Sequence, residues 1–152
     1  MKHKDLLRLY QNVKITVENE KTGEIYTQEV RNRIPTAGRN YIIDLIRGEN
    51  TEPITHFAVG TDDTATDDTD TTLGNEVYRQ SITKITTEDS LLSVNYFLSS
   101  NEANGNTITE AGIFNDSTAG DMLGRVVYSS IDKDENVSVT FEWDITLAYV
   151  EE

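Results

Sequence analysis

The stretch Val137-Ser138-Val139-Thr140-Phe141-Glu142-Trp143-Asp144-Ile145-Thr146-Leu147-Ala148-Tyr149 decides the fold of this chain. Apolar residues fill every second position, and polar or small residues fill the positions between them. This period of two predicts a β-strand with one buried and one solvent-facing side, and it is longer than the usual strand of about 5–6 residues. Because a strand that buries Phe141 and Trp143 needs partner strands and a covering layer, we expect the rest of the chain to supply both.

Working back toward the N-terminus, similar short patterns are separated by turns rich in Gly, Asn and Asp. They predict further strands over residues 12–18, 24–30, 54–60, 91–99, 107–115 and 122–130, and residues 73–79 lead into another strand that runs to about Thr86. Only the segment after Pro35 has a helical period, with apolar residues at 41, 42, 45 and 46, and Gly48 as the C-terminal stop. We expect Thr36 to cap this helix, over about 37–47. The fold class that follows is a mainly β, single-domain antiparallel β-sandwich or jelly-roll-like barrel with one short helix.

The first eleven residues have a charged start and could form a short helix or an arm; we predict an N-terminal arm over 1–11 before one β-sandwich domain over 12–152. The arm combines basic residues with a short apolar run. Either it makes an ordinary edge contact, or it docks onto a neighbouring subunit through its apolar side chains. The predicted partner-binding residues are Leu6, Leu7, Leu9 and Tyr10.

Composition excludes several classes of function. The 27 acidic and 13 basic residues give a net charge of −14, which argues against binding nucleic acid or an anionic membrane surface. Such acidity is typical of a soluble surface, or of a protein from a saline habitat. The absence of cysteine excludes disulfides and thiolate metal sites. No apolar run is long enough for a transmembrane helix, and the N-terminal apolar run is too short and broken for a secretion signal.

Four segments carry a resemblance to a known family. They are Ile54–Gly60, with Ala58-Val59-Gly60 at its end; Thr72–Arg79, with Asn75-Glu76-Val77-Tyr78-Arg79; Thr109–Phe114, with Glu110-Ala111-Gly112-Ile113-Phe114; and Met122–Val127. In order and spacing, over about residues 54–149, they resemble the N-terminal domain of phage tail-collar fibre proteins. Fibres of that family continue into a trimeric shaft and a receptor-binding tip, which these 152 residues do not contain. We therefore expect a docking module alone, or a related module used elsewhere on the particle.

The resemblance implies a non-enzymatic virion structural protein of a tailed virus, located at the tail or baseplate, which docks fibres or neighbouring virion proteins. It also implies other virion proteins as partners, a homo-oligomer with a trimer favoured, and no cofactor. Capsid decoration or a head fibre is an alternative place on the particle. A carbohydrate-binding β-sandwich is an alternative function, with Tyr10, Tyr26 and Tyr128 as binding platforms. For a hydrolase, the sequence has no legible nucleophile–base pair or metal cluster.

Three polar features are candidate sites. The loop Thr61–Thr72 contains five aspartates that could hold Ca²⁺, although they lack the regular spacing and the glycine of a calcium loop: Asp62, Asp63, Asp67, Asp68 and Asp70. Glu110 falls on the face of its strand that carries Ile108, Gly112 and Phe114, so we expect a structural ion pair with Arg79 or Arg125 rather than a catalytic role. His56 is expected to make a local hydrogen bond within its strand.

Overall fold

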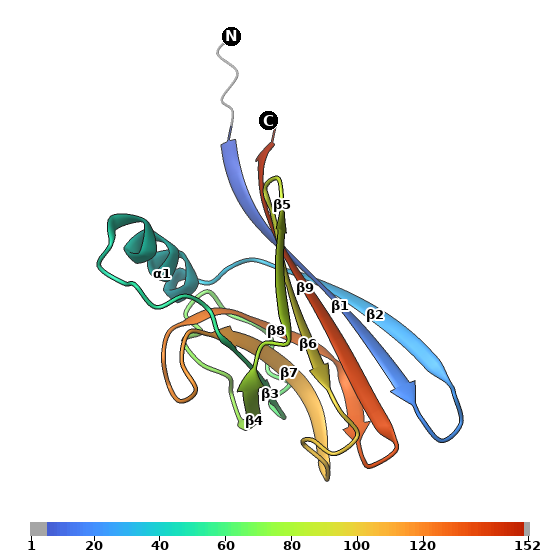
Figure 1. Cartoon of the computed structure of the whole chain (residues 1–152). Coiled ribbons are helices and arrows are strands. Elements are labelled where there is room, and N and C mark those ends of the chain that lie inside the picture. Colours follow the sequence, from blue (N-terminus) through green and yellow to red (C-terminus); the bar gives the residue numbers. More distant parts are fainter. Residues whose placement is uncertain (1–5, 151–152) are drawn as a thin grey trace.

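The computed structural model describes residues 6–150 and has two antiparallel sheets with one short helix (Figure 1). In chain order the elements are β1 (Leu6–Asn19), β2 (Ile25–Asn32), α1 (Thr36–Arg47), β3 (His56–Gly60), β4 (Glu76–Ser81), β5 (Lys84–Glu88), β6 (Leu91–Leu98), β7 (Asn106–Phe114), β8 (Met122–Lys133) and β9 (Val137–Val150). One sheet has the order β2-β1-β9-β6-β5 and the other β4-β3-β7-β8. The predicted single-domain β-sandwich with one short helix is confirmed.

Strand β9 is the centre of the five-stranded sheet, as its sequence pattern predicts. It pairs with β1 along its whole length and with β6 from Val139 to Thr146. Its odd-numbered residues face the second sheet, and Trp143 is completely buried there and donates to Gln11 Oε1 at 2.5 Å. Phe57 from β3 packs between the two sheets, with its ring centroid 4.8 Å from that of Phe141 and 6.1 Å from that of Trp143. Aromatic contacts across the two sheets therefore fix their spacing.

Helix α1 begins one residue before the prediction and ends where it was predicted. Gly48 lies beyond its last turn at a φ of +78°, in the left-handed conformation that favours glycine. Thr36 is the first helical residue and not the cap, because Pro35 occupies the capping position without a side-chain hydrogen bond. The helix packs closely against β8 at Gly38, where a side chain would overlap the backbone of Leu123.

Two boundaries differ from the prediction. The arm does not end at residue 11: its residues 1–5 lie outside the described residues, while Leu6–Asn19 is one continuous strand paired with β9. Gln11, the last residue of the predicted arm, is buried in the core. The strand predicted up to Thr86 is two strands, because the chain leaves the four-stranded sheet after Ser81 and joins the five-stranded sheet at Lys84. An apolar pattern that changes sheets keeps its alternation, so the sequence alone did not reveal the break.

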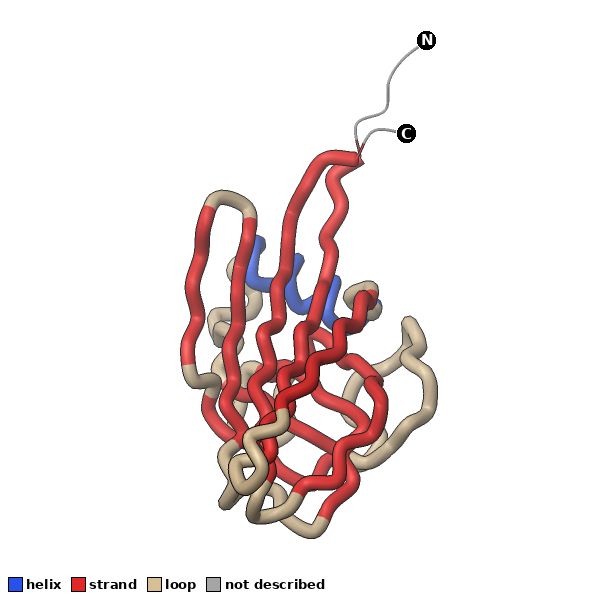
Figure 2. The backbone as a smooth tube through the Cα atoms, turned by 90° about the vertical axis from the view of Figure 1, so that its right-hand side faces the viewer, coloured by secondary structure: helices blue, strands red, loops and turns tan. Residues whose placement is uncertain are grey.

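The ends of β1 and β9 project together beyond the sandwich, and the β5–β6 hairpin rises beside them (Figures 1 and 2). Leu6 pairs with Val150 at the tip of this projection. No helix within residues 6–150 is long and apolar enough to cross a membrane.

We predict that Trp143→Ala lowers the free energy of unfolding by about 3–5 kcal/mol, the range for truncating a large buried aromatic side chain. The change removes contacts in both sheets and also leaves Gln11 Oε1 without its donor. Chemical denaturation measures the effect. Phe97→Ala is the matched control, because Phe97 is 47% exposed and should cost much less. A loss of only a few tenths of a kcal/mol for Trp143→Ala would contradict the central role of β9.

Candidate functional site

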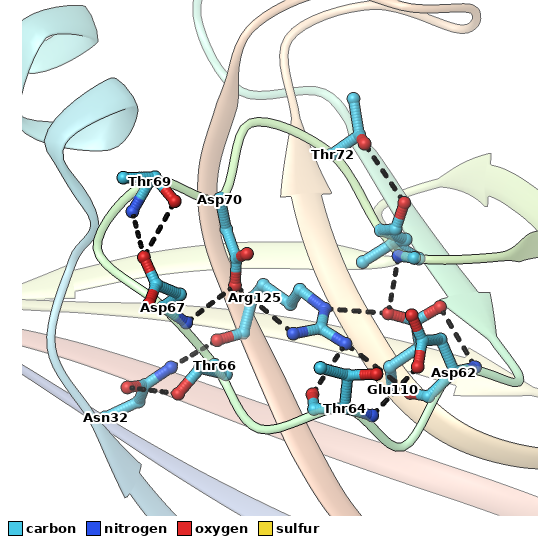
Figure 3. A network of polar contacts seen from close by, with 12 residues as sticks. Asn32, Asp62, Thr64, Thr66, Asp67, Thr69, Asp70, Thr72, Glu110 and Arg125 are labelled. Carbon is cyan, nitrogen blue, oxygen red and sulfur yellow. Dashed lines mark hydrogen bonds and ion pairs between the residues drawn. The ribbon is translucent and has the colours of Figure 1, made fainter.

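A buried ion pair lies on the outer face of the four-stranded sheet, beneath the Asp-rich loop (Figure 3). Glu110 on β7 accepts from Arg125 on β8, with Arg125 Nε 2.7 Å from Glu110 Oε2. The two side chains are 0% and 4% exposed. The structure thus confirms the predicted ion pair and selects Arg125 over Arg79.

The face assigned to Glu110 was only partly right, because β7 contains a bulge. The pairing of β7 with β8 shifts between Ile108 and Glu110. Ile108 therefore faces the main core, whereas Glu110 lies on the outer face with Gly112 and Phe114. Bulges redirect side chains in this way and leave little trace in the sequence pattern.

Both oxygens of Glu110 are also bonded to backbone amides at the two ends of the loop. Oε1 accepts from Asp62 N at 3.3 Å and from Asn75 N at 2.8 Å, and Oε2 accepts from Gly74 N at 2.9 Å. Gly60 lies directly opposite Glu110, and a side chain there would overlap the carboxylate. One carboxylate therefore holds the start and the end of the loop together.

Arg125 holds the middle of the same loop. Its Nη1 donates to Asp70 Oδ2 at 3.2 Å, and its Nη2 donates to the carbonyl oxygens of Thr64 at 3.1 Å and Asp62 at 3.5 Å. Its own carbonyl accepts from the side chain of Asn32 at the end of β2. Figure 3 shows the guanidinium group surrounded by the loop on one side and Glu110 on the other. The charge of Arg125 is thus balanced by two carboxylates and the loop backbone.

The tip of the loop is attached to helix α1 through Asp68. This carboxylate pairs with Arg39 Nη1 at 3.0 Å and accepts from Thr36 Oγ1 at 2.8 Å, while the Asp68 carbonyl accepts from Thr36 N. The hydrogen bonds from Arg39 and then Thr36 lower the pKa of Asp68. The Asp67 carboxylate accepts hydrogen bonds from the side chain and the backbone of Thr69, and these likewise lower its pKa. The loop is thus not a freely solvated segment but is bonded at its ends, its middle and its tip.

The five aspartates do not converge on one point. Asp68 pairs with Arg39 and Asp70 with Arg125, while Asp62 and Asp67 accept from Thr64 and Thr69 in tight local turns. Within residues 6–150 there is no group of three or more carboxylate or histidine side chains placed to hold a metal ion. The arrangement therefore favours ion pairs inside the protein over the calcium hypothesis.

Arg79, the alternative partner of Glu110, and His56 both have local structural roles. Arg79 stacks over the ring of Phe114 at 3.8 Å and donates to the carbonyl oxygens of Asp116 and Ala119, closing the β7–β8 turn. His56 Nδ1 lies 2.7 Å from Thr55 Oγ1, which is the local hydrogen bond expected of it.

Chemically, the Glu110 site is suited to holding a loop in one position, since its carboxylate already has four donors.

The predicted partner-binding residues lie on the projecting part of β1. Leu7 and Tyr10 are exposed, whereas Leu6 and Leu9 are half-buried, and Leu9 packs against the core. Of the proposed sugar platforms, Tyr128 is buried and donates to the carbonyl of Glu110. Tyr10 and Tyr26 are exposed but lie on opposite faces of the five-stranded sheet. Tyr10 pairs with Thr146 on the outer face, whereas Tyr26 pairs with Val17, which faces the core. They do not form one binding surface.

Sequence reasoning missed the amide anchors of the loop and its attachment to α1. The available signal was Gly60 and Gly74, which bracket the loop and both lack space for a side chain. The pairing of Asp68 with Arg39 joins residues 29 positions apart and has no local signature.

Comparisons with protein-family models, with curated proteins and with solved structures found no match to this chain.

We predict that Glu110→Gln lowers the free energy of unfolding by about 3–5 kcal/mol, because it leaves the charge of Arg125 buried with only Asp70 beside it. The amides of Gly74 and Asn75 should also exchange hydrogen faster, since the carboxylate that binds them is lost. Hydrogen exchange combined with chemical denaturation measures both effects. Glu49→Gln removes an exposed ion pair with Arg47 and should cost about 0–1 kcal/mol. Equal effects of the two substitutions would contradict the anchoring role.

We predict that the attachment of the loop to α1 is lost in acid. The pKa of Asp68 is lowered in the folded protein, so its stabilising effect is complete above the ordinary aspartate pKa of about 3.9 and disappears as pH falls through the lower folded value. Asp68→Asn should therefore lower the unfolding temperature at neutral pH but not at the acid end of a pH series. Asp63→Asn, at an exposed loop position, is the control. A loss independent of pH would show that the Asp68 carboxylate is not the source.

Proposed function

We propose that this protein is a non-enzymatic virion structural protein of a tailed virus. It is a collar-type docking module at the tail or baseplate that holds a fibre or a neighbouring virion protein. In this proposal it acts as a homo-oligomer, with a trimer favoured by the family that the sequence resembles.

One observation carries the proposal. The four segments that resemble tail-collar proteins come together as the four strands of a single sheet, with β3, β4, β7 and β8 side by side. Asn75, Glu110 and Arg125, which form the buried network, all fall within these segments. The resembled segments therefore build one face of the molecule, and its docking role is inferred by analogy with the resembled family.

The chemistry of that face supports a structural role. Glu110 is the carboxylate best placed for catalysis by its burial, yet its oxygens are bonded to Arg125 and to three backbone amides. A general acid or base needs a free position within hydrogen-bond reach of a substrate. A fixed loop over a buried ion pair instead gives a docking surface of constant shape, which lowers the ordering cost of binding.

The experiment is electron microscopy of intact particles from the virus that encodes the chain, labelled with gold-conjugated antibody against the purified protein. The proposal expects label at the tail or baseplate. Particles from a virus with the reading frame disrupted are the control and should not be labelled. Label on the head would favour capsid decoration or a head fibre, and no label on any particle would contradict a virion role.

A further inference from the structure

The projecting ends of β1 and β9 form a two-stranded ribbon, residues 6–10 paired with residues 146–150. Strand β2 pairs with β1 only from Gln11 onward, so it does not cover the edge of the ribbon that carries Leu7, Leu9 and Tyr10. On the other side, β6 pairs with β9 only up to Thr146, and the last bond there is from Leu147 N to the Ser90 carbonyl. The ribbon thus continues past both of its neighbouring strands.

The β1 side of the ribbon is basic and hollowed. Where β2 turns away toward α1, two hollows of about 630 and 450 Å³ flank the edge, and Tyr10, Asn32 and Arg33 line both. Arg31 and Arg33 are exposed there. The exposed arginines at these hollows favour an acidic partner.

The β9 side of the ribbon is acidic. The two-residue turn between β5 and β6 rises beside β9 (Figure 2), with exposed Glu88 and Asp89. Asp89 has a φ of +50°, a conformation that hairpin turns of this length require. Glu88 and Arg31 lie on the same outer face of the sheet and at similar levels along β9. Glu88 pairs with Leu91, which pairs with Thr146 of β9. Arg31 pairs with Asn12, which pairs with Asp144 of β9. The two sides of the ribbon therefore have complementary charge.

The inner face of the ribbon is apolar. Leu7, Leu147 and Tyr149 are 58%, 43% and 77% exposed, and they continue the face that carries Trp143 in the core. A cluster of large exposed apolar side chains at an open strand edge is a common feature of interaction sites.

The geometry points to a second copy of this chain as the occupant, joined head to tail: the β9 edge of one copy pairs with the β1 edge of the next. When two ribbons point the same way, this pairing is antiparallel, because β1 and β9 run in opposite directions. It places the acidic turn of one copy at Arg31 and Arg33 of its neighbour, and the two ribbons form one continuous sheet. Because the two surfaces differ, the contact is heterologous, and we propose that it closes into a ring, as the homo-oligomer of the proposed function requires.

This inference specifies how the homo-oligomer of the proposed function is assembled. It rests on the oligomer and not on the virion role. It is tested on the purified full chain, so failure of the virion role and failure of this interface give different results. The first test is light scattering across a concentration series. Arg31→Glu with Arg33→Glu should weaken self-association about tenfold or more, and Glu88→Lys with Asp89→Asn should do the same.

Combining all four substitutions in one chain should restore assembly, because the two surfaces are then complementary with charges exchanged. Glu135→Lys, in the exposed β8–β9 turn at the other end of β9, is the matched control and should assemble as the unmodified chain does. A monomer at every concentration would overturn the inference. So would assembly that none of the charge variants weakens.

Disulfide cross-linking tests the direction of the contact. The chain has no cysteine of its own, so only the introduced cysteines can react. Residues 31 and 88 lie in the two edge strands of the five-stranded sheet, roughly 19 Å apart at about 4.8 Å per strand, too far for a disulfide within one chain. Under mild oxidation, a chain with both Arg31→Cys and Glu88→Cys should form covalent ladders. Either substitution alone should leave single chains. Efficient dimers from Arg31→Cys alone would indicate two-fold pairing and overturn the head-to-tail arrangement.

Discussion

The buried pair of Glu110 and Arg125 is the interaction on which most of the polar structure depends. Removing two charges from water is costly, and the cost is offset only where every remaining hydrogen-bonding position has a partner. Glu110 meets this condition with three backbone amides, and Arg125 meets it with Asp70 and two carbonyl groups. Since these partners come from one long loop, the loop can close in only one position. We infer that the pair contributes specificity of shape more than net stability.

From this pair, contacts extend to elements that do not belong to the four-stranded sheet. Asp68 carries the loop to the first turn of α1, and Asn32 ties the end of β2 to the carbonyl of Arg125. The five-stranded sheet contributes the apolar side of the sandwich, with Trp143 and Phe141 facing Phe57. The two sheets therefore have different roles: one is fixed by polar contacts on its outer face, and the other by aromatic packing on its inner face.

Sequence patterns predicted the parts of this structure that depend on local periodicity. The alternation around Trp143 identified the central strand, and Pro35 with Gly48 bounded the helix to within a residue. The patterns failed where a strand changed its partner or its face. The bulge before Glu110 reversed its relation to Ile108, and the crossing after Ser81 divided one apolar run between two sheets. At the site, burial of a lone glutamate implied an arginine partner, but choosing Arg125 over Arg79 required the register of β7 and β8, which no local pattern contains.

Strand edges give the final constraint, because an edge with unpaired backbone groups invites association unless it is protected. Two other edges of the described sheets are protected. Strand β2 bonds to β8 through Gln28 and Ser129, and β5 is short and mostly polar, with Lys84 and Glu88 at its ends. The ribbon edge differs, since β2 does not reach it and it presents Leu7 and Leu9 next to a hollow that Arg33 also lines. We therefore infer that this apolar edge is continued by a strand of a second copy, and we propose the acidic turn beside β9 as the matching surface within the same molecule.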